Sequence, residues 1–420
     1  MRSKRDGGSL LLYLVCAGCL IIVTLFFSYG YEKTWRLWNV PTMEPYLIDS
    51  RVITAGAEAH ALGNDPLINN PGFTRMNYPR VWQLLFYLGI DQSDTIYFGL
   101  VFAALFFFGV FLITRNIDRP TAWLMTCAIF SPDVLLGLER GNSDLLVFFL
   151  CALAVYLVKR SRVGTAIVIA FAFLLKLYPV FALAVFLREN KKVFRAIMVS
   201  SIVLCGIYTM VMLGELRLIR AATPKPQAAA YGVDVAWTNM MNHHFLHAEV
   251  AIRIASYLAV VLIAAFSLYY AGRHGDAESN GDVHIDSFRV GAASYIGTFL
   301  VGGNWDYRLM ILLFVIPQLM FWRRSPSRSV RYTATTTLVF VMISLWSWFA
   351  RGLLAHLLSV SFLLDQFSNW IVFSGLMCLF VYSWPNWLKS WLPRARAEVP
   401  SAQERSGAGT LLAGMSKISN

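Results

Sequence analysis

Charged side chains are scarce in this sequence of 420 residues: they make up 14% of it, whereas a soluble globular domain carries roughly 25%. Apolar residues make up 57% and fall into long blocks instead of alternating with polar ones. This shortage of charge excludes a cytosolic enzyme and a disordered protein. The net charge of +12 does not indicate nucleic-acid binding, because membrane proteins gather Lys and Arg in cytoplasmic loops. The composition predicts one all-α polytopic membrane protein.

Cysteine is also scarce, and all six cysteines lie inside apolar blocks, where they behave as small hydrophobic side chains. A disulfide framework of the kind that staples small secreted modules is therefore excluded. The sequence also lacks the internal repeat that many transporters show. A transporter or lipid flippase should show that repeat and should carry charges through the bilayer midplane, and it stays as an alternative.

The apolar blocks predict ten to twelve membrane helices, since most of them approach the roughly 20 residues that a spanning helix needs. When these blocks are taken to cross the membrane alternately, most Lys and Arg residues fall in the segments on the inner side. Both termini are therefore expected in the cytoplasm. We expect one membrane domain over 1–396, long outer loops at 32–93 and 215–253, and a disordered cytoplasmic tail at 397–420. The blocks are 7–31, 95–114, 121–138, 142–158, 163–187, 196–214, 254–272, 290–305, 309–322, 332–350 and 352–388.

Two blocks do not fit a single straight span. Block 163–187 has basic residues on both sides, and Lys176 and Pro179 interrupt it, which predicts two half-helices that meet near the outer face. Block 352–388 is interrupted by Asp365, which predicts a short outer segment followed by a last span from about 368.

Ionisable and polar residues from distant parts of the chain gather on the outer side of this topology. Such a convergence of acids and cations on one membrane face is typical of a functional site. The residues are Asp49, Arg140, Asn142, Asp144, Lys176, Tyr178, His243, His244, His247, Asn304, Trp305, Asp306, Tyr307 and Arg308.

The first outer loop has an alanine-rich run at 55–62, which predicts a short helix along the membrane surface that ends at Gly63–Pro66. Asp49 stands before this run. It is therefore a candidate N-cap of that helix, and this structural role is the alternative to a catalytic one.

These motifs resemble a known family. Asp49, the run from Ala55 to Pro66, Tyr78-Pro79, Gly141-Asn142 and Lys176-x-Tyr178-Pro179 occur in an order and placement similar to the polyprenyl-phosphate-dependent hexosyltransferases of glycosyltransferase family 87. Over about 45–310, the chain resembles these GT-C-type membrane enzymes, which include α-1,2-mannosyltransferases. The resemblance implies a GT-C-type helical bundle in a bacterial plasma membrane.

The resemblance also implies a reaction. A hexose, with mannose favoured, would pass from a polyprenyl-phosphate donor to a hydroxyl of a glycolipid or glycan acceptor on the extracytoplasmic side. No metal and no cofactor are expected, and the transfer would be inverting. Asp49 would act as the base. Candidates for the donor phosphate are Lys176, Arg140, Arg308, His243 and His244, and candidates for substrate contact are Asn142, Tyr178, Tyr78, Asp306 and Tyr307.

Other interpretations stay open for these side chains. Lys176 could reach the interface, Arg140 could pair with Glu139 or Asp144, and Arg308 could pair with Asp306. The histidines could be structural, or could bind a metal, although no closely placed carboxylate or cysteine completes a zinc set. A surface-polysaccharide polymerase or ligase would share the lipid-linked substrates.

Overall fold

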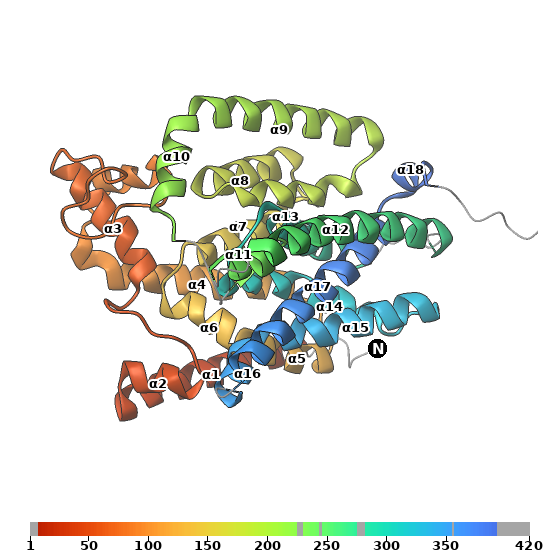
Figure 1. Ribbon diagram of the computed structural model, residues 1–420, viewed down its shortest axis with the longest axis horizontal. Helices are drawn as coiled ribbons and strands as arrows, with labels where there is room; N and C mark the ends of the chain where they lie inside the picture. The colour runs from red at the N-terminus through yellow and green to blue at the C-terminus, as the bar shows by residue number, and fades with distance from the viewer. Residues whose placement is uncertain (1–6, 225–229, 243–245, 275–281, 355–356, 393–420) are drawn as a thin grey trace, which may run out of the picture.

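The computed structural model describes residues 7–224, 230–242, 246–274, 282–354 and 357–392. The expected tail at 397–420 lies outside these residues. The described chain is mostly helical, as the sequence predicts, and Figure 1 shows most of the long helices packed lengthwise into one bundle. The first elements are α1 (Gly7–Tyr29), α2 (Tyr31–Leu37), α3 (Ile48–Ala61), η2 (Arg80–Leu88), η3 (Gln92–Asp94), α4 (Thr95–Ile113), α5 (Arg119–Ile129), α6 (Pro132–Glu139) and α7 (Asp144–Leu157), where η marks a 3₁₀ helix.

The second part of the chain contains the only two strands among the described residues, β1 and β2, which pair antiparallel with Tyr231 opposite Asn304. The elements are α8 (Arg162–Leu175), η4 (Tyr178–Arg188), α9 (Lys191–Val211), α10 (Leu213–Ala222), β1 (Ala230–Tyr231), α11 (Val235–Asn242), α12 (Leu246–His274), α13 (Ile285–Val301), β2 (Asn304–Trp305), η6 (Asp306–Phe314), α14 (Ile316–Trp322), α15 (Arg328–Leu345), α16 (Ser347–Leu353), α17 (Leu358–Tyr382) and α18 (Asn386–Lys389).

Among the described residues, five helical segments are long and apolar enough to cross a membrane, and there are seven if two bent helix pairs each count as one span. The bends are 53° between α5 and α6 and 59° between α15 and α16. Other apolar blocks form shorter helices, such as α7, α8 and η4. The protein is therefore an all-α, multi-pass membrane protein, in which several hydropathy blocks fold as short or broken helices.

The bundle has two distinct ends. In Figure 1, α2, α3 and α10 lie at one end, which we call the α3 end. At the other end, the α18 end, the Trp387 indole donates a hydrogen bond to the carbonyl of Glu189, just before α9. The centre of the bundle is α13, which is buried almost throughout, whereas α9 has no buried residue and lies at the edge. An apolar helix without buried residues is suited to face lipid.

The two half-helices predicted for block 163–187 are present. Helix α8 ends at Leu175, Lys176 adopts an extended conformation, and η4 begins at Tyr178. The two basic flanks of the block meet, because Arg162 forms an ion pair with Glu189 over 2.8 Å. The block is thus a re-entrant hairpin with its apex at the α3 end.

Two predictions about local structure were wrong. Helix α17 begins at Leu358 and runs through Asp365, so the last span does not start near 368. Asp365 does not interrupt the helix because its carboxylate is paired with Arg351 at 2.8 Å. The surface helix near 55–62 exists but begins earlier, and its N-cap is Leu47 rather than Asp49. Asp49 lies inside the first turn, and side chains rather than backbone amides contact its carboxylate.

Candidate functional site

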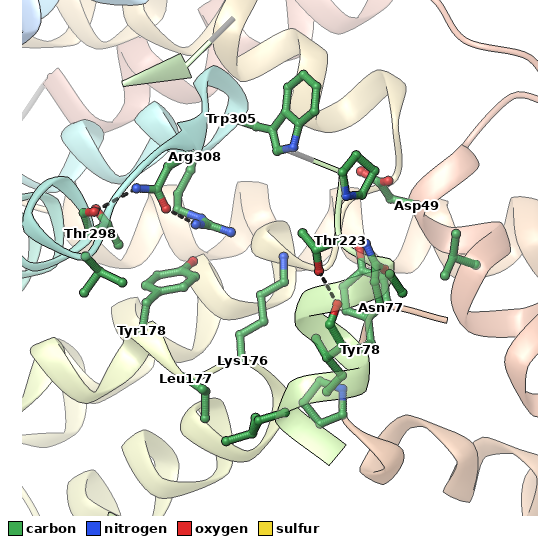
Figure 2. A pocket seen from close by; sticks show the side chains of 18 of the residues that line it. Asp49, Asn77, Tyr78, Lys176, Leu177, Tyr178, Thr223, Thr298, Trp305 and Arg308 are labelled. Carbon is green, nitrogen blue, oxygen red and sulfur yellow. Dashed lines mark hydrogen bonds between the residues drawn. The ribbon is translucent and has the colours of Figure 1, made fainter. Parts of the chain in front are cut away.

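A cavity of about 1320 Å³ opens at the α3 end of the bundle (Figure 2). The first outer loop, α8, η4, α9, α10 and the β2–η6 segment all contribute to its wall. One part of the wall is polar, with Asp49, Arg140, Lys176 and Arg308. Figure 2 shows the side chains of Lys176 and Arg308 reaching toward the same part of the cavity. Four predicted site residues from four separate segments therefore meet here.

Asp49 is held from the turn that joins α6 to α7. Its carboxylate accepts two hydrogen bonds from the Arg140 guanidinium, with 2.7 Å from Nε and 3.0 Å from Nη2, and a third from the amide of Asn142. Such a bidentate, charge-assisted pair fixes both distance and orientation. Between the two donors, Gly141 has a φ of 55°, and an added Cβ would lie 2.5 Å from Ser50 Oγ. Only glycine therefore allows the turn to approach α3 this closely.

Asn142 connects Asp49 to Lys176. Its amide nitrogen donates to Asp49, and its oxygen accepts from Lys176 Nζ at 3.0 Å and from the backbone amide of Asp144 at 2.8 Å. The side chain is fully buried and does not line the cavity. Its predicted contact with substrate therefore has no counterpart on the cavity wall, and its place is that of a bridge behind the wall.

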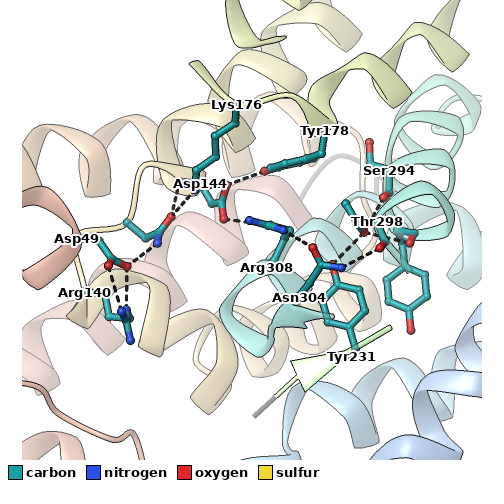
Figure 3. Close-up of polar contacts among 12 residues, drawn as sticks. Asp49, Arg140, Asp144, Lys176, Tyr178, Tyr231, Ser294, Thr298, Asn304 and Arg308 are labelled. Carbon is teal, nitrogen blue, oxygen red and sulfur yellow. Dashed lines mark hydrogen bonds and ion pairs between the residues drawn. The ribbon is translucent and has the colours of Figure 1, made fainter. Parts of the chain in front are cut away.

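Asp144 is the centre of the second half of the network (Figure 3). One carboxylate oxygen accepts from Lys176 Nζ at 2.8 Å and from the Tyr178 hydroxyl at 3.0 Å, and the other lies 3.3 Å from Arg308 Nε. Asp144 itself is completely buried. It therefore holds three donors that line the cavity while its own carboxylate stays behind them.

The short sheet positions Arg308. The Asn304 side chain accepts a hydrogen bond from Arg308 and donates to the carbonyl of Thr298 at 2.8 Å. Because Asn304 also pairs with Tyr231 in the ladder, the start of η6 is anchored to α13 and β1. Asn304 was among the polar residues predicted on the outer side. Its anchoring role depends on a strand pairing that the hydrophobic periodicity of the sequence does not reveal.

Aromatic rings complete the polar wall. The Arg140 guanidinium lies 5.7 Å from the ring centre of Trp305 and 5.6 Å from that of Tyr307, and Lys176 Nζ lies 5.3 Å from the ring centre of Tyr78. At these distances the rings attract the cations. Burial, reinforced by the nearby Asp49 carboxylate, raises the pKa of Tyr78 well above its ordinary value, so its hydroxyl stays protonated.

The structure also decides between the alternative partners. Arg140 pairs with Asp49, and Glu139 instead accepts from the backbone amide of Met43. Arg308 pairs with Asp144 rather than with Asp306, and Lys176 is paired and largely buried rather than extended to the interface. These partners were not predictable, because they lie 91, 164 and 32 residues away along the chain, respectively.

Asp306 is the predicted site residue that the structure places elsewhere. It is fully buried, does not line the cavity, and faces Arg351 at 3.9 Å. His243 and His244 lie outside the described residues, and His247 is described only as part of the backbone of α12. In the described part of the chain, no three His, Cys, Asp or Glu side chains are grouped so as to hold a metal ion.

The sequence model of glycosyltransferase family 87 matches residues 85–282. This segment is just under half of the chain, and over it the sequence is similar to glycosyltransferase family 87. The protein is therefore a membrane glycosyltransferase, an enzyme that moves a sugar from a donor to an acceptor. The matched segment includes Arg140, Asn142, Asp144, Lys176 and Tyr178, which form most of the network. Neither the curated proteins nor the solved structures contain a match to this chain.

Proposed function

We propose that this glycosyltransferase moves a hexose, with mannose favoured, from a polyprenyl-phosphate donor to the hydroxyl of a glycolipid or glycan acceptor. One observation carries the proposal: the Asp49 carboxylate and four basic side chains, one of them Arg75, share a single cavity that continues into an apolar groove. A sugar attached to a lipid phosphate needs all three features, which are a base, a phosphate site and a lipid site.

The apolar part of the cavity is suited to a lipid chain. Phe173, Leu177 and Phe181 of the re-entrant hairpin line one side, and Met210 of α9 and Leu216 of α10 line the other. Helix α9 has no buried residue, so this wall borders the lipid phase. A polyprenyl chain could therefore lie between the hairpin and α9 while its phosphate reaches the cations.

Asp49 is suited to act as the base. An ionised carboxylate offers about four acceptor sites, and three of those on Asp49 are used by Arg140 and Asn142. The free site is on Oδ1, which accepts only from Arg140 Nη2, and Asp49 lines the cavity. An acceptor hydroxyl there can give its proton to Asp49 while its oxygen bonds to the anomeric carbon.

The bond between the anomeric carbon and the phosphate oxygen breaks in the same step, and its electron pair stays on the phosphate. Lys176 and Arg308 are placed to stabilise this developing charge, because both line the cavity and are held by Asp144. Asp49 is the only carboxylate that lines the cavity among the described residues. Without a second carboxylate to form a covalent intermediate, single displacement with inversion is the mechanism that fits.

We further propose that the α3 end faces the extracytoplasmic side of a bacterial plasma membrane. Basic residues concentrate at the other end, where Lys159, Arg160, Arg162 and Arg188 surround the ends of the re-entrant hairpin. Cytoplasmic loops carry such an excess of Lys and Arg. A reporter-fusion map that placed Asp49 and Lys176 on the cytoplasmic side would contradict this orientation.

The function is tested with purified protein and a panel of radiolabelled polyprenyl-phosphate sugars, followed by identification of the product and its anomeric configuration. Transfer from a polyprenyl-phosphate hexose, lost in Asp49→Asn, is the expected result. Transfer from a nucleotide sugar alone would overturn the lipid donor. Formation of a polymer rather than a single added sugar would favour a polysaccharide polymerase.

A further inference from the structure

Asp144 is a charged residue that the proposed reaction does not use directly. Its carboxylate is completely buried behind Lys176, Tyr178 and Arg308, and it does not line the cavity (Figure 3). Both oxygens are occupied, one by Lys176 and Tyr178 and the other by Arg308. It therefore has no free acceptor site directed at a substrate, and its influence must pass through the donors that it holds.

The charges of the network add up to a small surplus. Three cations, Arg140, Lys176 and Arg308, are joined by ion pairs to two carboxylates, Asp49 and Asp144, which leaves one positive charge. At pH 8, two further charged groups near this network have opposite signs and leave the sum unchanged. They are Arg75 on the cavity wall and Glu139 beside Arg140.

This surplus matches the donor and not the product. A lipid-phosphate sugar is a phosphodiester with one negative charge, so its complex with the network is neutral. The lipid phosphate that leaves is a monoester with a second pKa of about 6, and it carries up to two negative charges at neutral pH. Once Asp49 has released the proton that it took from the acceptor, the complex of this product with the network has one excess negative charge in a site of low dielectric, where charge imbalance is unfavourable.

We propose that Asp144 is a positioning residue that also sets this balance, so that the site binds the singly charged donor and releases the doubly charged product. The inference rests on the proposed lipid-phosphate donor. Without the Asp144 charge, the network would have two excess positive charges and would retain the product.

The pH dependence of this effect comes from the ligand. The ionisable groups that surround Asp144 have ordinary pKa values outside the range from 5 to 8. They are Lys176 from the hairpin apex, Tyr178 of η4, Arg308 of η6, Cys151 of α7, Asp49 of α3, Tyr78 of the first outer loop, Tyr231 of β1 and Tyr307 of η6.

The experiment compares two probes on the purified full-length protein. Farnesyl phosphate changes from one to two negative charges between pH 5 and pH 8, whereas its methyl diester keeps one charge throughout. Dissociation constants for both are measured by titration calorimetry, with wild-type protein and with Asp144→Asn. We expect the preference for the monoester over the diester to rise about tenfold in Asp144→Asn at pH 8, and to return to the wild-type value at pH 5.

A purely structural role for Asp144 predicts a different result. Loss of positioning alone would weaken the binding of both probes by the same factor at both pH values. That outcome would overturn the inference. The diester serves as the internal control, because any titration of the protein itself affects both probes.

Two further variants keep the test decisive. Asp286→Asn removes the charge of another buried aspartate that holds a Lys and an Arg, at the α18 end, and should leave the ratio unchanged. Arg308→Gln removes one positive charge and should shift the ratio against the monoester at pH 8, even if Asp144→Asn does not fold. An unchanged ratio in Arg308→Gln contradicts the inference. If neither probe binds wild-type protein, the lipid-phosphate donor itself is wrong.

Discussion

Two buried aspartates, Asp144 and Asp286, make the same kind of contact at opposite ends of α7. Asp144 begins the helix and holds Lys176 and Arg308, and Asp286 lies beside the end of the helix and holds Lys159 and Arg188. Their surroundings differ. The two cations of Asp144 line a cavity of about 1320 Å³ together with Asp49, whereas those of Asp286 line a pocket of about 460 Å³ whose other charged residues are mostly basic.

The two aspartates also differ in how completely they are bonded. Both oxygens of Asp144 have partners, while Oδ1 of Asp286 has none among the described residues. The side chain of Lys159 is 50% exposed, against 12% for Lys176. An ion triad therefore does not by itself make a catalytic site. We propose that role for the triad at the α3 end because the Asp49 carboxylate and an apolar groove share its cavity.

Replacement of the proposed base, Asp49, should produce the largest difference in sugar transfer between variants at the two ends. Asp49→Asn keeps the shape of the side chain but removes its ability to take a proton, so transfer should fall by at least about 100-fold. The measurement is the rate of sugar transfer in membranes supplied with lipid-linked sugar. Asp286→Asn is the control and should transfer sugar at the wild-type rate. Equal activity of Asp49→Asn and wild type would remove Asp49 from the mechanism.

Removal of one lysine at each end should have nearly as unequal an effect on the KM for the donor. Lys176→Ala removes a donor aimed into the cavity and should raise the KM for the donor by about tenfold or more, since hydrogen bonds to charged groups are worth about 1.5–3 kcal/mol. Lys159→Ala removes the corresponding lysine at the α18 end and should leave this KM unchanged. If both variants raise the KM alike, the effect is on folding or insertion and not on the phosphate.

Removal of the two aspartates should also lower the stability of the protein by unequal amounts. Asp144→Ala leaves two largely buried cations without their partner and should lower the free energy of unfolding by about 3 kcal/mol. Asp286→Ala should lower it by only about 1 kcal/mol, because Lys159 is half exposed and its charge is screened by water. Thermal unfolding in detergent compares the two variants, and a larger loss in Asp286→Ala would contradict the ranking.

The smallest effect is expected from removal of the N-cap of α8, which lies at the α18 end. The Ser161 hydroxyl accepts a hydrogen bond from the Gly164 amide at 3.0 Å and starts α8. Ser161→Ala should lower the free energy of unfolding by about 1 kcal/mol and should not change sugar transfer. A change in the KM for the donor in this variant would show that the two ends are coupled through the hairpin.

The membrane class and the broken hairpin follow from short stretches of sequence. A block of apolar residues with basic flanks on both sides cannot cross the membrane once, so 163–187 had to turn back, and Lys176 marked the apex. Family 87 resemblance and membrane topology together placed Asp49, Arg140, Lys176 and Arg308 on one face. The cavity wall contains all four.

What these local patterns could not provide was the pairing of charges across the bundle. Asp49 satisfied the rule for an N-cap, yet Arg140 and Asn142 reach its carboxylate from a turn 91 and 93 residues away. Asp365 was predicted to break the chain before the last span, but it lies within α17 and is paired with Arg351. The same applies to Asp144, whose importance depends on three partners from later segments. Hydropathy and capping act over a few residues along the chain, whereas an ion pair depends only on distance in space, and that distance is set by how the helices pack.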